Sequence, residues 1–364
     1  MEYIALKDVC KINMGQSPDS SSYNEKGKGI PFFQGNADFG ERYPVTRVWC
    51  NAPTKVAQPG DILISVRAPI GALNYAKEEC CIGRGLAALT PDKRVVSVDY
   101  IYWLLRGKKN ELNSKGTGST FKAISRKTLD EMQIPNIDLE KQHKYAQILE
   151  KTYAIIQMRK HQLFILDDLI KARFVEMFGD PVTNPYKWDE TTVGDECFYI
   201  KDGPHKSLPD IGKENGGHPF ISVRNIVNHT IDFSTAKYIS DADYVDAIKK
   251  CHPEKGDMLY SKGGTTGIAK LIDVDIEFAN WVHVAVLKFH KDKLNGIFFE
   301  NMLNCDYCYD QSQRLTKGIA NRDLVLSAMA QIKMYRPPME LQNQFADFVR
   351  QVDKSKVVVK KVLE

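Results

Sequence analysis

The sequence predicts an α+β protein, with two similar domains of mixed strands and helices that are separated by two long helices packed as an antiparallel coiled coil. Two observations predict this fold class. The first is a long segment that has apolar residues at heptad spacing and contains no helix breaker. The second is a repeat of the whole domain-plus-helix unit about 200 residues further along the chain. Two such units supply two helices that can cover each other's apolar faces.

The central segment, residues 139–178, is expected to form one helix. Its apolar side chains recur every seven residues, at Leu149, Ile156, Leu163, Ile170 and Met177. Ala146, Tyr153 and Phe174 widen this line into a stripe, which is the pattern of a helix that packs against a partner helix. The first break comes at Gly179. A helix of this length spans about 60 Å, which favours a spacer over a core helix of one large domain.

The C-terminal segment, residues 338–364, repeats this pattern and is the expected partner. The coinciding residues at the helix starts are Glu140 with Glu340 and Gln142 with Gln342. At this offset Glu364 stands at the position of Phe164, so the second helix is expected to end about four turns short of the first.

The domain before each long helix is also repeated. The two copies share residues at their turns, whereas their loop sequences differ. The matching pairs are Asp8 and Asp195, Pro31 and Pro219, Gly60 and Gly256, Asp61 and Asp257, Ser65 and Ser261, and Gly71 and Gly267. Between these pairs the two copies differ completely, which is how one frame carries two different recognition surfaces. The expected boundaries are residues 1–137 and 179–337 for the domains, 138–178 for the central helix and 338–364 for the C-terminal helix. Strands are expected at 62–66 and 86–89, and helices at 98–112 and 294–303.

Length and composition exclude little. At 364 residues the chain has room for two or three domains, and its net charge of +4 permits a polyanionic partner without requiring one. No apolar run is long enough to span a membrane and the N-terminus shows no signal peptide, so a cytoplasmic protein is expected. The eight cysteines are expected to be reduced and buried. Cys305 and Cys308 form the one CxxC pair, and nothing in the sequence brings Cys251 and His252 to it to complete a metal site.

A search for catalytic motifs finds none that is convincing. The run Gly263-Gly-Thr-Thr-Gly267 has the glycines of a phosphate-binding loop but lacks the lysine that would follow them. Asn184-Pro185-Tyr186 has one proline where adenine methyltransferases carry two, and it lies in a turn-rich linker. No metalloprotease or nucleophile-elbow motif occurs. The sequence therefore predicts a protein without its own catalytic centre, cofactor or metal.

The order of these parts resembles that of the specificity (S) subunits of type I restriction–modification enzymes, over essentially the whole chain. The resemblance is clearest in three segments of the sequence. They are the Gly60-Asp-Ile-Leu turn, the Gly116-Thr-Gly-Ser-Thr turn and the run Ala172-Arg-Phe-Val-Glu-Met-Phe-Gly-Asp-Pro181, which closes the central helix. The resemblance implies two target-recognition domains, each reading one half of a split double-stranded DNA target. It further implies that the helices contact two modification (methyltransferase) subunits, which restriction (motor–nuclease) subunits join.

The loops offer side chains that can contact DNA, since arginine pairs with guanine, Asn and Gln with adenine, and Lys, Ser and Thr with phosphate. The candidates in the first domain are Gln34, Asn36, Arg42, Arg47, Arg67, Arg84, Lys115, Thr117 and Ser119. Those in the second are Lys201, His205, Lys206, Arg224, Asn225, Lys262, Thr265, Thr266, Arg314 and Lys317. The sequence does not separate base readers from phosphate contacts. Two other functions stay open: an enzyme whose site is assembled from distant residues, and a scaffold that binds proteins but no DNA.

Overall fold

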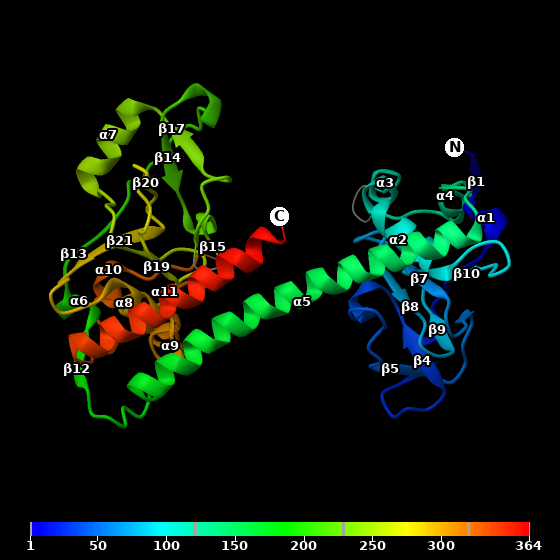
Figure 1. Cartoon of the computed structure of the whole chain (residues 1–364), viewed down its shortest axis with the longest axis horizontal. Coiled ribbons are helices and arrows are strands. Elements are labelled where there is room, and N and C mark those ends of the chain that lie inside the picture. Colours follow the sequence, from blue (N-terminus) through cyan, green and yellow to red (C-terminus); the bar gives the residue numbers. More distant parts are fainter. Residues whose placement is uncertain (1, 119–121, 228–229, 319–320, 364) are drawn as a thin grey trace. The chain divides into compact units, whose positions relative to one another are not determined.

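The computed structural model describes residues 2–118, 122–227, 230–318 and 321–363. The chain divides into two units, Met1–Gln157 and Met158–Glu364, which are described separately. The division falls within α5 (Leu139–Phe178), the 40-residue helix, whose bounds match those expected from the sequence (Figure 1). None of the helices in the described part of the chain is both long and apolar enough to cross a membrane.

The first unit contains two sheets and a strand pair. A four-stranded sheet has the order β2-β10-β7-β8, a five-stranded sheet has the order β3-β5-β4-β9-β6, and β1 pairs with β11. The strands are β1 Tyr3–Ala5, β2 Cys10–Met14, β3 Tyr23–Asn24, β4 Ile30–Phe33, β5 Val48–Cys50, β6 Val56–Ala57, β7 Ile62–Ser65, β8 Leu73–Tyr75, β9 Cys80–Ile82, β10 Leu86–Pro91 and β11 Gln133–Pro135. The shorter helices are α1 Leu6–Val9, α2 Val98–Gly107, α3 Lys109–Ser114 and α4 Arg126–Asp130. The first half of α5 packs on this unit through buried Ala146 and through Tyr153, whose ring lies 5.3 Å from that of Trp103.

The second unit repeats this arrangement. Its four-stranded sheet has the order β13-β21-β18-β19, β12 pairs with β22, and a three-stranded sheet has the order β17-β14-β20. The strands are β12 Asp189–Thr192, β13 Cys197–Asp202, β14 His218–Ile221, β15 Ile226–Val227, β16 Thr230–Ile231, β17 Lys237–Ile239, β18 Met258–Ser261, β19 Ala269–Leu271, β20 Ala279–Asn280, β21 Val284–Phe289 and β22 Lys333–Arg336. The helices are α6 Val193–Glu196, α7 Asp241–Lys250, α8 Gly296–Asn304, α9 Asp306–Leu315, α10 Leu326–Met329 and α11 Met339–Lys361. The parallel pair β4–β9 of the first unit has its counterpart in β14–β20, so the duplication expected from the sequence is confirmed in the topology.

The repeated dipeptides form the same turn in both units. Gly60 and Gly256 have φ angles of +87° and +88°, a region that glycine adopts without steric cost. The carboxylates of buried Asp61 and Asp257 each accept the backbone N–H three residues earlier, at 2.8 and 2.9 Å. Both residues of the dipeptide are therefore needed to make the turn.

The repeated glutamines join each long helix to the domain before it. Gln142 Oε1 accepts the N–H of Ser97 at 2.8 Å, and Gln342 Oε1 accepts that of Asn295 at 2.9 Å. Each amide nitrogen also donates to the carbonyl five residues earlier, at 2.8 and 2.7 Å. Both glutamine side chains are buried, so these bonds satisfy their amide groups and at the same time pair a backbone N–H and a backbone carbonyl of the domain.

Within the second unit, α11 packs antiparallel against the end of α5. The ring of Phe345, which is fully buried, lies 5.4 Å from that of Phe174 and 5.5 Å from that of Phe178. Further along α11, Lys356 Nζ lies 2.7 Å from Asp167 Oδ1. The later residue of α11 meets the earlier residue of α5, which confirms the antiparallel pairing for this part of the helices.

The expected helix at 98–112 is two helices, α2 and α3, which meet at Lys108. Gly107 lies at this junction and weakens a continuous helix. The second unit has a similar pair, in which α8 and α9 meet at Cys305 with extended backbone.

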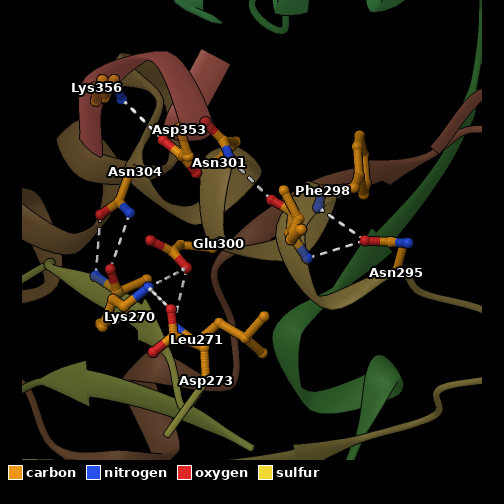
Figure 2. Close-up of polar contacts among 12 residues, drawn as sticks. Lys270, Leu271, Asp273, Asn295, Phe298, Glu300, Asn301, Asn304, Asp353 and Lys356 are labelled. Carbon is orange, nitrogen blue, oxygen red and sulfur yellow. Dashed lines mark hydrogen bonds and ion pairs between the residues drawn. The ribbon is translucent and has the colours of Figure 1, made fainter. Parts of the chain in front are cut away.

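A buried ion pair fixes α8 to the edge strand β19. Figure 2 shows Glu300 directed at Lys270 and at the backbone of Leu271 (Figure 2). Its Oε2 lies 3.4 Å from Lys270 Nζ and accepts the N–H of Leu271 at 2.9 Å. Burial raises the pKa of the Glu300 carboxyl above its ordinary value, and the nearby ammonium group offsets part of this rise.

The cysteines are free thiols, as the sequence predicts. Seven of the eight are buried, and Cys305 is half-buried.

Candidate nucleic-acid interface

Four candidates of the first unit lie around one hollow. Gln34 and Asn36 follow β4, Arg67 follows β7, and Arg84 lies between β9 and β10. Together with Gly35, Ala68 and Gly85 they line a cavity of about 200 Å³. The sequence places these residues in three separate loops, and the structure brings the three loops together.

Close backbone packing holds these loops in place. The Asp38 carboxylate accepts the N–H of Gln34 at 2.7 Å and that of Gly35 at 3.2 Å, which closes a short turn after β4. Gly85 donates its N–H to the carbonyl of Gln34 at 3.1 Å. A Cβ at Gly85 would lie 2.4 Å from that carbonyl oxygen, so only glycine allows this approach.

The hollow presents two arginines whose charges are not neutralised. Arg67 and Arg84 are exposed, and neither side chain forms an ion pair with any residue that the structure describes. The amide of Gln34 is exposed beside them and exchanges hydrogen bonds with Ser17 Oγ at 2.9 and 3.2 Å. Guanidinium and amide groups on one face can bond the edges of bases or the oxygens of phosphates.

Arg42 has a different role from the one its residue type suggests. Its guanidinium forms an ion pair with Glu150 and lies over the rings of Tyr75 and Tyr102, at 5.2 and 6.0 Å. Hydrogen bonding to the Glu150 carboxylate raises the pKa of Arg42. Arg42 therefore joins a loop to α5. Because its charge is paired and its guanidinium face lies on two rings, it is poorly placed to contact DNA.

The other candidates of the first unit lie outside the hollow's lining. Arg47 and Thr117 are exposed, and Lys115 Nζ forms an exposed ion pair with Glu111 at 2.8 Å. Ser119 lies outside the described residues.

Three candidates of the second unit are buried and have structural partners. Lys262 is 5% exposed, and its Nζ lies 2.8 Å from Asp323 Oδ1 and 3.6 Å from Asp202 Oδ2. Asn225 accepts the N–H of Ser222 at 2.9 Å and so closes the turn after β14. Thr266 shares a hydrogen bond of 3.0 Å with a second hydroxyl, that of Thr316. We therefore withdraw these three as DNA contacts, since each is itself buried and hydrogen-bonded within the domain.

The remaining candidates of the second unit are exposed. They are Lys201, His205, Lys206, Arg224, Thr265, Arg314 and Lys317. His205 Nε2 lies 3.8 Å from Asp202 Oδ2, and Lys206 pairs with Asp246 at 2.7 Å.

The second unit has an aromatic side chain, that of His283, where the first has Gly85 of the hollow. Val66 donates its N–H to the carbonyl of Gly85 at 2.9 Å, and Lys262 donates to that of His283 at 2.8 Å, so Gly85 and His283 are equivalent. The ring of His283 lies 4.6 Å from that of Trp281. Neither ring is among the candidates chosen from the sequence; the signal available was their place directly after β20, as Gly83-Arg-Gly85 follows β9.

The comparisons with known proteins identify relatives for both halves. A family model described as the type I restriction modification DNA specificity domain matches residues 1–164 and 185–363. A protein of Methanocaldococcus jannaschii, described as the MjaX specificity subunit of a type I restriction enzyme, is 43% identical over 152 residues. That match covers 42% of this chain and only 36% of the relative. The MjaIX specificity subunit of the same organism is 26% identical over 308 residues, which is 78% of this chain and 71% of that protein.

A solved structure is similar to this chain over its whole length. It is the type I restriction–modification system S subunit of M. genitalium, with a TM-score of 0.60 and 17% sequence identity. The match covers 100% of this chain and 91% of that one, and it supports the fold described above.

Proposed function

The chain belongs to the type I restriction modification DNA specificity domain family, and from this membership we propose that it is the DNA-recognition subunit of a type I restriction–modification complex. In this proposal each unit reads one half of a split double-stranded target. The subunit acts in the cytoplasm without a catalytic centre or cofactor of its own. It docks two modification (methyltransferase) subunits, which restriction (motor–nuclease) subunits join.

The observation that carries this proposal is that the two units share the same turns and sheet order but present different loop residues. The turns at Gly60 and Gly256 and the order of the four-stranded sheets are the same in both units. At equivalent places, however, one unit carries the exposed Arg67 beside glycines and the other carries Trp281 and His283. A protein that reads two unlike half-sites needs this combination, because the frame positions the loops and the loops select the bases.

We assign the hollow of the first unit to base or phosphate contact. Arg67 and Arg84 supply the charge, and Gln34 and Asn36 supply amides that can pair with adenine. In the second unit we assign contact to the exposed candidates, among them Arg224 and Arg314.

The direct test is methylation-sensitive sequencing of DNA from cells that carry the chain with its modification subunits. We expect one methylated motif made of two short specific parts with an unspecified gap. Changing Arg67 and Arg84 together should alter one part of the motif and leave the other part unchanged. A continuous motif, or a change in both parts, would contradict the assignment of one half-site to each unit.

The two alternative functions give different results with the purified chain. An enzyme would bind S-adenosylmethionine saturably in calorimetry and would modify or cut DNA unaided. A scaffold would bind no duplex DNA even when the modification subunits are present. We expect neither result.

A further inference from the structure

The CxxC pair of the second unit lies at the start of a helix. Cys305 is the N-cap residue of α9, and Cys308 is the third residue of that helix. Side chains at these two positions of a helix lie close together, since they are the positions that bond reciprocally in a capping box. The two thiols are therefore neighbours on the first turn of α9.

The two thiols differ in their access to solvent. Cys305 is half-buried, whereas Cys308 is fully buried in the apolar core of the unit. The Cys308 thiol donates to the carbonyl oxygen of Lys333, which lies 3.5 Å from its Sγ. A reagent from solution therefore reaches Cys305 and does not reach Cys308.

The surroundings of the pair favour a thiolate at Cys305. Hydrogen bonding to the Cys308 thiol lowers the pKa of the Cys305 thiol, while burial acts in the opposite direction. The same hydrogen bond raises the pKa of Cys308. The N-terminal end of α9 also favours negative charge at its N-cap. The more accessible thiol is thus the one that loses its proton, and the thiolate is the nucleophilic form of cysteine.

The pair is not part of the frame that the two units share. Ser97 and Asn295 are equivalent, because each donates its N–H to the repeated glutamine of the long helix. Lys109 and Tyr309 are equivalent, because each lies against the matched glycine of its unit. Lys109 comes twelve residues after Ser97, whereas Tyr309 comes fourteen residues after Asn295. The two additional residues fall in the stretch that carries both thiols, and the first unit forms the same frame without a cysteine in this stretch.

The pair also lacks the neighbours of a metal site. A structural zinc ion takes four ligands, of which the two thiols would supply half. In the described part of the chain, no further His, Cys, Asp or Glu side chain joins them in a group of three that could hold a metal ion. The chemistry left to the pair is that of a dithiol.

We propose that Cys305 and Cys308 form a reactive dithiol site, which low-molecular-weight disulfides oxidise to an intramolecular disulfide. The Cys305 thiolate attacks one sulfur of the small disulfide R–S–S–R and forms a mixed disulfide, while R–S⁻ leaves and takes up the proton that Cys305 has lost. Cys308 then gives up its proton to the second leaving group as its sulfur attacks Cys305 Sγ. Two protein thiols and one small disulfide thus become one protein disulfide and two small thiols.

The test follows thiol–disulfide exchange between the full chain and oxidised glutathione. Samples are taken over time, free thiols are blocked with N-ethylmaleimide, and tryptic peptides are read by mass spectrometry. Cys305 and Cys308 share one tryptic peptide, residues 294–314, and Cys80 and Cys81 share another, residues 78–84. We expect peptide 294–314 to lose both maleimide labels and to carry an internal disulfide.

The adjacent pair Cys80 and Cys81 is the internal control. Both side chains are fully buried in β9, and burial raises the pKa of Cys80 to about 12. In the folded chain these thiols should react at least about tenfold more slowly than Cys305, since each unit of pKa changes the thiolate fraction about tenfold. In guanidinium chloride, which removes the burial and the helix, the two peptides should react at similar rates.

Two variants separate the attacking thiol from the resolving thiol. Cys308→Ser keeps a hydroxyl donor beside Cys305 but cannot close the disulfide, so glutathione should stay bound to Cys305 as a mixed disulfide. Cys305→Ser should abolish exchange at Cys308, which is buried. Serine is a favoured N-cap residue, so Cys305→Ser should keep the helix content that circular dichroism measures in the unchanged chain.

Three results would overturn the proposal. The first is a peptide 294–314 from the unchanged chain that keeps both maleimide labels in excess oxidised glutathione. The second is oxidation of Cys80 and Cys81 as fast as that of Cys305 in the folded chain. The third is an unchanged rate of exchange at Cys308 in Cys305→Ser, which would make Cys308 the attacking thiol.

Discussion

Replacing Arg67 by alanine should weaken DNA binding without destabilising the fold. Arg67 is exposed and has no ionic partner among the described residues, so the free energy of unfolding should change by no more than about 0.5 kcal/mol. If its guanidinium forks onto a base, the loss should be about 1–3 kcal/mol, which is about 5- to 150-fold in the dissociation constant, at one position of the target. If it holds a phosphate instead, all sequences should be bound more weakly and the salt dependence should become shallower by about one charge.

Arg42→Ala in the same unit is the matched control. Arg42 is paired with Glu150 and stacked on Tyr75 and Tyr102, so its removal should lower stability by about 1–2 kcal/mol. Its effect on the affinity of the folded protein for DNA should be small. Affinity is measured by fluorescence anisotropy of a labelled target duplex with the assembled complex, over a series of salt concentrations. Unchanged affinity for Arg67→Ala, together with strong loss for a folded Arg42→Ala, would move the DNA contact from the hollow to the face beside α5.

Gln142→Ala and Gln342→Ala should each lower the stability of their own unit by about 2–4 kcal/mol, because each removes the hydrogen-bond partner of two backbone groups. Chemical denaturation tests this, and an effect below about 1 kcal/mol would refute it. Phe345→Ala should cost about 3–5 kcal/mol, whereas Tyr145→Ala at the equivalent, exposed position should cost much less; similar losses in thermal unfolding would contradict the assigned exposures. Because burial raises the pKa of Glu300, the folded chain takes up this proton before the unfolded chain as the pH falls, so the contribution of this carboxyl to stability should decrease as the pH rises above about 4.5. The difference in unfolding free energy between the unchanged chain and Glu300→Gln, followed from pH 4 to 7, should show this slope, and a flat or rising difference would count against it.

The fold was predictable from the sequence where the backbone itself demands a residue type. A φ near +87° demands glycine at Gly60 and Gly256, and the backbone N–H three residues before each aspartate donates to the buried carboxylate of Asp61 or Asp257. These residues are the same in both units although the loops between them differ, so the duplication can be recognised from them. The long helix α5 was predictable because a heptad pattern that is sustained over many turns is typical of a helix packed along its length. The break at Lys108 was less visible, because a single weak helix former is tolerated in many helices.

The candidate site was only partly predictable, because the type of a residue does not show whether its side chain points into the domain or out to solvent. Lys262 was chosen for its charge, but it stands at the position of Val66, one residue after the matched serine. The two side chains are 5% and 3% exposed, so the frame directs this position inward in both units. The next position is Arg67 in the first unit and Gly263 in the second, and it is this position that faces the hollow.

The two units also exchange large and small residues across this place. In the first unit the large Arg67 lies opposite Gly85, which must be glycine because the Gln34 carbonyl approaches it closely. In the second unit the small residue is Gly263 and the large one is His283, whose Cδ2 would lie 2.2 Å from a Cβ on Gly263. The large side chain lies on one loop in the first unit and on the neighbouring loop in the second, while the backbone hydrogen bond between the two loops is the same in both. The chemistry presented to a partner then differs, although the frame that positions it does not.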